Sequence, residues 1–165
     1  MTKEFLTEYL EHISYEIEGL VSSYMQMSEI SDRSKTHPFE LQGQKNDCLD
    51  LMALHFRNLY EFFCFAPKEN YVRATDYIID FKGNSDSYLI NKANNQTSHF
   101  TKQRHELAKE HASKSWDPNS VMKWFVVNFD KFIDGLTENY KLELSKRLVL
   151  VVPFIEWYKK EHEKN

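Results

Sequence analysis

The chain has 165 residues, a length at which one domain closes a hydrophobic core without disulfide or metal support. Hydrophobic residues make up 41 % of it and aromatic residues 15 %, which argues against an intrinsically disordered chain. The formal net charge of −4 excludes a protein that binds nucleic acid or anionic lipid with its whole surface, although it leaves room for a local basic patch. We therefore predict a single domain that spans residues 1–165.

The first half of the chain predicts two helices joined by a long loop. Apolar residues recur every three or four positions from Lys3 to Met27, which is the spacing of an amphipathic helix. Residues 28–45 are mostly polar, so we expect a loop there. A second helix is expected to start at Asn46 or Asp47, as its N-cap, and to end near Phe65. Its spacing predicts the following buried positions: Cys48, Met52, His55, Leu59 and Phe62.

The middle of the chain is less regular. Residues 71–81 fit either a short helix or an extended segment, because their aromatic and β-branched run suits both. Residues 82–87 are rich in Gly, Asn, Ser and Asp and predict a break. A third helix is expected over residues 88–111, although several Asn residues weaken its first half.

The last third of the chain predicts two more helices. Residues 117–120 combine a Pro with capping residues and start a fourth helix over residues 121–144. Residues 148–160 are expected to form a last helix bent at Pro153. Only four Gly and four Pro are present, so turn signals for an all-β fold are scarce. The sequence therefore predicts an all-α fold, a mainly antiparallel bundle of four to five helices with more than about 60 % helix.

The two cysteines bear on the compartment of the protein. Cys48 and Cys64 fall in one expected helix, where a rise of about 1.5 Å per residue separates them by about 24 Å, too far for a disulfide. Free thiols and the absence of an apolar leader after Met1 indicate the cytoplasm. The most apolar stretch, residues 148–155, is far shorter than the roughly 20 residues of a spanning helix, so no contact with a membrane is expected.

Arg104 and His111 form the most suggestive polar pair. They are separated by six residues, which places both on one face of the expected third helix, and polar His105 follows the arginine. This arrangement resembles the motif of the HEPN superfamily of helical bacterial proteins, many of which are metal-independent ribonucleases. The resemblance implies a homodimer that acts on RNA, in which Arg104 stabilises phosphate charge and His111 assists proton transfer. The alternative is structural: an arginine paired with a carboxylate and a histidine of the core.

Two other segments resemble recurring segments of uncharacterised bacterial helical proteins. One carries His55 and Arg57 in a His-x-Arg pattern, and the other carries His99 and Arg104 in a His-x-Thr-x-x-Arg pattern. The resemblance covers residues 46–114 and implies no particular activity.

We expect the second and third helices to enclose one polar pocket. The expected lining residues are His55, Arg57, His99 and Arg104, with His111 at the edge. Helices that pack about 8 to 10 Å apart bring such side chains together. The cluster then either binds a phosphate or is neutralised by carboxylates such as Glu61, which is also placed to form an ordinary surface pair with Arg57.

Other kinds of chemistry have little support in the sequence. His99, Gln103, Glu106 and Glu110 share a helix face, but the usual His-x-x-x-His and Glu-x-x-His spacings of helical metal sites are missing. No nucleophile motif or phosphate-binding glycine loop is present, and no cofactor is expected. The leading hypothesis is a HEPN-like bundle that binds or cleaves RNA as a homodimer, and the alternative is a non-catalytic bundle that binds another protein.

Overall fold

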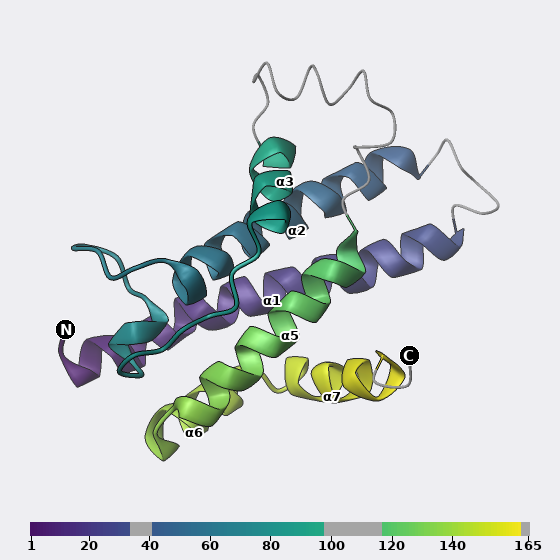
Figure 1. The fold of residues 1–165 in the computed structure, drawn as a ribbon. Coiled ribbons are helices and arrows are strands. Elements are labelled where there is room, and N and C mark those ends of the chain that lie inside the picture. Colours follow the sequence, from purple (N-terminus) through teal and green to yellow (C-terminus); the bar gives the residue numbers. More distant parts are fainter. Residues whose placement is uncertain (34–40, 98–116, 163–165) are drawn as a thin grey trace.

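The computed structural model describes residues 1–33, 41–97 and 117–162. These residues form six α-helices and one short 3-10 helix, and they contain no strand (Figure 1). Helices account for 79 % of the described residues, which confirms the all-α class for this part of the chain. None of the described helices combines the length and the apolarity needed to cross a membrane.

Helix α1 (Lys3–Arg33) and helix α2 (Gln42–Cys64) lie side by side and run in opposite directions (Figure 1). Both reach into residues 28–45, so the prediction of a loop over that whole segment was wrong, as was the start of the second helix at Asn46 or Asp47. The physical reason is a small second cluster, separate from the main core, between the end of α1 and the start of α2. Its buried members are Met27, Ile30, Leu41 and Cys48.

The buried face of α2 follows its periodicity. All five positions expected to be buried are at most 6 % exposed: Cys48, Met52, His55, Leu59 and Phe62. The helix also contributes to an aromatic core. The ring of Phe132 from α5 lies 5.2 Å from the ring of Phe62 and 5.7 Å from the ring of Phe63. Rings from several elements therefore fix how α2 and α5 meet.

The segment after α2 contains the 3-10 helix η1 (Ala74–Asp76), which resolves the ambiguity of residues 71–81. The hydroxyl of Tyr77 donates to the carbonyl oxygen of Leu6 at 2.7 Å and ties this segment to α1. The expected break at residues 82–87 follows, and the side chain of Asn128 from α5 binds its backbone. This fully buried amide accepts from the backbone N–H of Asn84 at 2.6 Å and donates to the carbonyl of Trp124 at 2.9 Å.

Helix α3 (Ser87–Thr97) crosses α2 (Figure 1). The third helix was expected to extend to residue 111, but residues 98–111 lie outside the described residues. The fourth helix, expected over residues 121–144, is divided into α5 (Pro118–Gly135) and α6 (Glu138–Arg147). Leu136 takes an extended backbone with ψ of 149° at the division. The described residues therefore hold six helices rather than four or five.

The last helix, α7 (Val151–His162), contains Pro153 in its first turn. The N–H that a proline lacks has no partner inside the helix at that position, so the helix continues without interruption past Pro153.

Candidate functional site

The structure locates two of the five predicted site residues. His99, Arg104 and His111 lie outside the described residues. His55 and Arg57 are both on α2, but they are two residues apart, which is about 200° around a helix. His55 is buried and the Arg57 side chain is 46 % exposed, so the structure does not bring these two side chains together.

His55 lies between α1 and α2. Its Nδ1 is 2.7 Å from a carboxylate oxygen of Glu16, and the ring of Tyr15 meets it edge-on with centroids 5.6 Å apart. The ring also covers Gly19, where an added Cβ would lie 2.3 Å from Nε2 of His55. These contacts are those of a histidine that packs two helices together.

Arg57 pairs with Glu61, as its spacing predicts, with 3.6 Å between Nε and Oε1. The other carboxylate oxygen of Glu61 lies 3.8 Å from Nη2 of Arg73, which follows α2 in the segment before η1. Sequence reasoning missed Arg73, because it sits in a stretch without clear periodicity. Only 6 % of its surface is exposed, an unusual environment for an arginine.

A cavity of about 350 Å³ opens beside Arg73, between α1, α2 and the segment before η1. Its polar lining comes from three parts of the chain: His12, Glu16, Asn58, Glu61, Tyr71 and Arg73. An arginine, a histidine and two carboxylates converge on this cavity. Such a concave site with convergent polar groups is a natural candidate for ligand binding.

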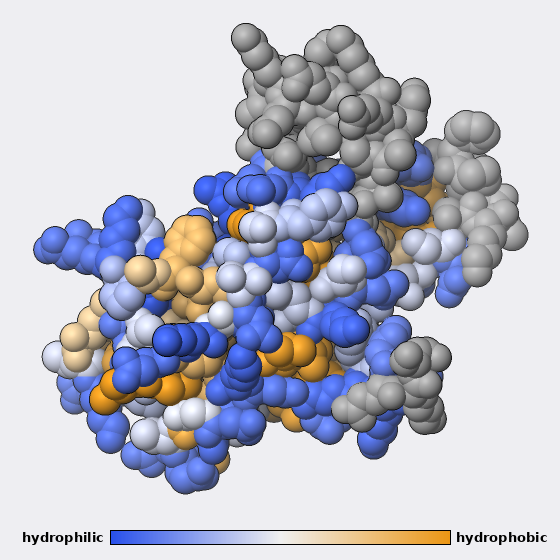
Figure 2. All heavy atoms as spheres, in the orientation of Figure 1, coloured by the Kyte–Doolittle hydropathy of each residue, from blue (hydrophilic) through white to orange (hydrophobic). Residues whose placement is uncertain are grey.

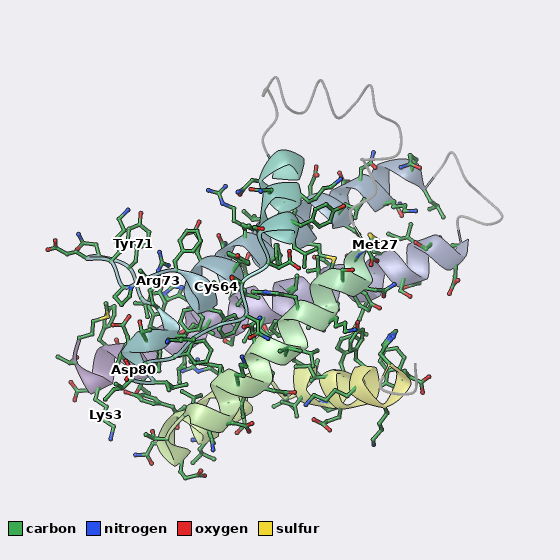
Figure 3. All side chains as sticks on the ribbon, in the orientation of Figure 1. Lys3, Met27, Cys64, Tyr71, Arg73 and Asp80 are labelled. Atoms are coloured by element: carbon green, nitrogen blue, oxygen red, sulfur yellow. The ribbon has the colours of Figure 1, made fainter. Side chains whose placement is uncertain are left out.

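Aromatic rings surround the Arg73 guanidinium. Its Cζ lies 4.8 Å from the ring centroid of Tyr71 and 5.8 Å from that of Phe65, and Figure 3 shows Tyr71 and Arg73 next to each other beyond the end of α2. Both residues are exposed, Tyr71 to 44 % and Phe65 to 47 %. Lys68 adds a second cation 4.8 Å from the Tyr71 centroid.

The guanidinium has unused donor capacity. Nε of Arg73 is buried and has no hydrogen-bond partner among the described residues. The 3.8 Å approach of Nη2 to Glu61 is longer than a direct hydrogen bond. A buried donor without an acceptor costs about 1–3 kcal/mol, so a ligand oxygen that reached this group would relieve a real penalty.

The cysteines offer no activated nucleophile. Burial raises the pKa of the Cys64 thiol to about 12, and burial also raises the pKa of Cys48. Both side chains therefore stay protonated near neutral pH, whereas a reactive cysteine needs a thiolate. In the part of the chain that the structure describes, no group of three or more His, Cys, Asp or Glu residues is arranged to hold a metal ion.

A second cavity, of about 430 Å³, lies between α5, α6 and α7 and is mostly apolar. Figure 2 shows hydrophobic atoms between α5 and α7 on this face. Val149 and Leu150, in the turn that joins α6 to α7, are 64 % and 86 % exposed. Large exposed apolar side chains next to an apolar groove are typical of a surface that another molecule covers.

No family model, curated protein or solved structure matches this chain.

Proposed function

We propose that this protein is a mainly antiparallel helical bundle that binds RNA at the cavity beside Arg73. The observation that carries the proposal is the buried Arg73 guanidinium, with a free donor at Nε and the exposed rings of Phe65 and Tyr71 around it. Surfaces that bind single strands combine cations with exposed aromatic rings, because phosphates pair with the cations and bases stack on the rings.

The charges around the cavity are balanced, whereas the whole chain carries a net charge of −4. Glu61 is shared by Arg57 and Arg73, which leaves one positive charge on this trio. Lys68 adds another, and Glu16 is engaged by His55. Glu69 is exposed on the same segment but is not part of the cavity lining. Arg57 and Lys68 do not line the cavity either, and with Glu16 and Glu69 counted the three positive and three negative charges balance. Recognition of a phosphate therefore rests on the donors of the buried Arg73 guanidinium rather than on an excess of positive charge.

Cleavage of RNA belongs to the same proposal. Arg104 and His111 are the pair that the HEPN resemblance implies for catalysis, and His99 is a further proposed binding residue. Incubating the purified chain with total RNA, beside a His111→Ala variant, tests this part. We expect metal-independent cleavage by the wild type and none by the variant, and wild-type protein that leaves RNA intact would remove the ribonuclease activity from the proposal.

The binding test compares the buried Arg73 with Arg147, whose side chain is 33 % exposed. We expect Arg73→Gln to weaken the binding of a labelled RNA by at least about tenfold at about 50 mM salt, where phosphate contacts are strong. Arg147→Gln is the matched control. Arg147 also has a buried Nε without a partner and a loose ion pair, 3.9 Å from Glu11, but it does not line this cavity.

Fluorescence anisotropy gives both affinities, and thermal melts show that the variants are folded. Wild-type protein that does not bind RNA at this salt concentration contradicts the proposal. Equal losses in the Arg73 and Arg147 variants would contradict the assigned site.

A second function has its own observation. The exposed Val149 and Leu150 beside the apolar groove favour a protein-binding surface formed by α5, α6 and α7. In this alternative the chain is a non-catalytic interaction bundle. It predicts that Leu150→Glu abolishes association with a protein partner and leaves RNA binding unchanged, which separates the two functions in one variant.

A further inference from the structure

We infer that the cavity beside Arg73 takes one unstacked nucleotide, with its phosphate on Arg73 and its base against Tyr71, so that the protein selects single-stranded over double-stranded RNA. This inference rests on the proposed function and adds to it the form of RNA that the site accepts.

The size of the cavity supports a single nucleotide. Its volume of about 350 Å³ lies at the small end of ligand sites, which span about 300–1,000 Å³. A base inside a duplex is stacked and paired and cannot enter such a cavity, whereas a base of a single strand can be turned outward at little cost.

The phosphate position follows from the donors of Arg73. Nε has no acceptor, and Nη2 lies 3.8 Å from the Glu61 carboxylate. The planar guanidinium can therefore offer two parallel donors to a phosphate, an arrangement that a lysine cannot reproduce. Because 94 % of the residue is shielded from water, a hydrogen bond to it is strengthened by the low local dielectric.

The base position follows from the wall next to Arg73. Tyr71 lines the cavity and keeps 44 % of its surface exposed. The Nζ of Lys68 lies 4.8 Å from the centroid of the Tyr71 ring. This lysine is exposed, and its flexible side chain can move from the ring to a phosphate. Asn58 and His12 also line the cavity and supply hydrogen-bonding groups for the edge of a base.

The nearest structural explanation is that Arg73 only holds the segment after α2 in place. It predicts that Arg73 variants lose stability and that nothing small competes for the cavity. The inference predicts competition by a mononucleotide, which a purely structural arginine would not produce.

The experiment measures competition and strand preference on the full chain. A labelled single-stranded RNA of about 12 nucleotides is compared with the same strand in a duplex, and adenosine monophosphate, adenosine and inorganic phosphate are added as competitors. We expect at least about tenfold preference for the single strand. We also expect the monophosphate to compete better than adenosine or phosphate alone, since it alone carries both recognised groups.

Tyr71→Leu separates stacking from folding, because the residue is exposed and the change keeps an apolar side chain. We expect it to lower affinity for the single strand by about tenfold, the effect of losing one stacked base, and to leave affinity for the duplex unchanged. Tyr15→Leu is the control, since Tyr15 is 64 % exposed and does not line the cavity.

The outcomes separate the two claims. Equal binding of single and double strands, without competition by the monophosphate, would overturn this inference and leave RNA binding standing. A Tyr71→Leu variant that binds the single strand as tightly as the wild type would also overturn it. Failure to bind either form of RNA would remove both this inference and the proposed function.

Discussion

At Gly19, helices α1 and α2 approach so closely that only a hydrogen atom fits beneath the ring of His55. The ring cannot move aside easily, because Glu16 holds its Nδ1 at 2.7 Å and the residue is 94 % buried. His55 and Gly19 therefore set the distance between the two longest helices of the described chain, which also form two walls of the cavity beside Arg73.

Two glycine substitutions test this contact. We expect Gly19→Ala to destabilise the protein by about 1–3 kcal/mol, because its methyl group overlaps the His55 ring. Gly43→Ala is the control: no atom lies within 4 Å of an added Cβ, and the residue is in the first turn of α2, so stability should rise by up to about 1 kcal/mol. Urea unfolding measures both, and equal effects of the same sign would show that the helices do not meet as described.

Buried tyrosines predict a loss of stability in alkali. Burial raises the pKa of Tyr158 to about 12 and also raises that of Tyr77. Below about pH 10 both phenols are neutral in the folded and the unfolded chain, so their contribution is fully present. Above it the unfolded chain releases protons that the folded chain keeps, and each group lowers the free energy of unfolding by up to about 1.4 kcal/mol per pH unit.

Urea unfolding between about pH 9 and about pH 11 measures this decline. The Cys64 thiol, with its pKa raised to about 12, contributes in the same direction. A Tyr158→Phe variant should show a smaller slope, and a free energy of unfolding that stays constant over this range would contradict the burial of these groups.

At the scale of elements, the boundaries of α5 and α6 show two different ways of starting a helix. Asp117 caps α5: its carboxylate accepts from the N–H groups of Asn119 and Ser120 at 3.1 and 3.2 Å. Thr137 stands at the same position before α6 but makes no capping hydrogen bond with its side chain. The start of α6 is instead fixed by packing, since Leu136 and Tyr140 are buried on either side of Thr137.

The two caps give a matched pair of substitutions. We expect Asp117→Ala to lower stability by about 1 kcal/mol, because two N–H groups at the start of α5 lose their acceptor. Thr137→Ala should change stability by less than about half of that, since no capping bond is lost. Thermal melts of both variants check the difference, and a larger loss for Thr137→Ala would mean that the capping assignment is mistaken.

At the scale of the whole molecule, two regions on the surface of the described residues differ in chemistry. The cavity beside Arg73 is polar and ringed by aromatic side chains, whereas the groove between α5, α6 and α7 is apolar. A chain that binds RNA at the cavity and a second copy of itself at the groove would use both regions. Homodimerisation remains a prediction of the HEPN resemblance, and the apolar groove is a surface on which it can be tested.

Sedimentation tests the homodimer. We expect twice the mass of the 19.7 kDa chain at micromolar concentration, and a monomer for Leu150→Glu, because a charge would have to be buried if this exposed residue lies in the interface. Lys160→Glu is a control for an introduced glutamate, as Lys160 is exposed near the other end of α7, away from Leu150. A wild type that sediments only as the monomer contradicts the prediction.

The candidate site could be predicted only in part from the sequence. The Arg57–Glu61 pair follows from its spacing and is present. The separation of the His55 and Arg57 side chains also follows from the sequence, because residues two positions apart in a helix point in directions about 200° apart. Nothing local indicates that Glu61 reaches Arg73 or that Arg73 is buried, because these depend on how the chain turns after α2.

The sequence by itself determined the all-α class, the buried face of α2 and the break before α3, because repeating apolar positions and Gly-Asn-Ser runs act on the chain locally. Only the tertiary structure decided the length of α1, the division between α5 and α6, and the cavity beside Arg73. The atoms responsible are far apart in the sequence: Ile30 packs with Leu41 and Cys48, and Asn128 binds Asn84, 44 positions away. Local propensity carries no information about such partners, so burial against them overrides it.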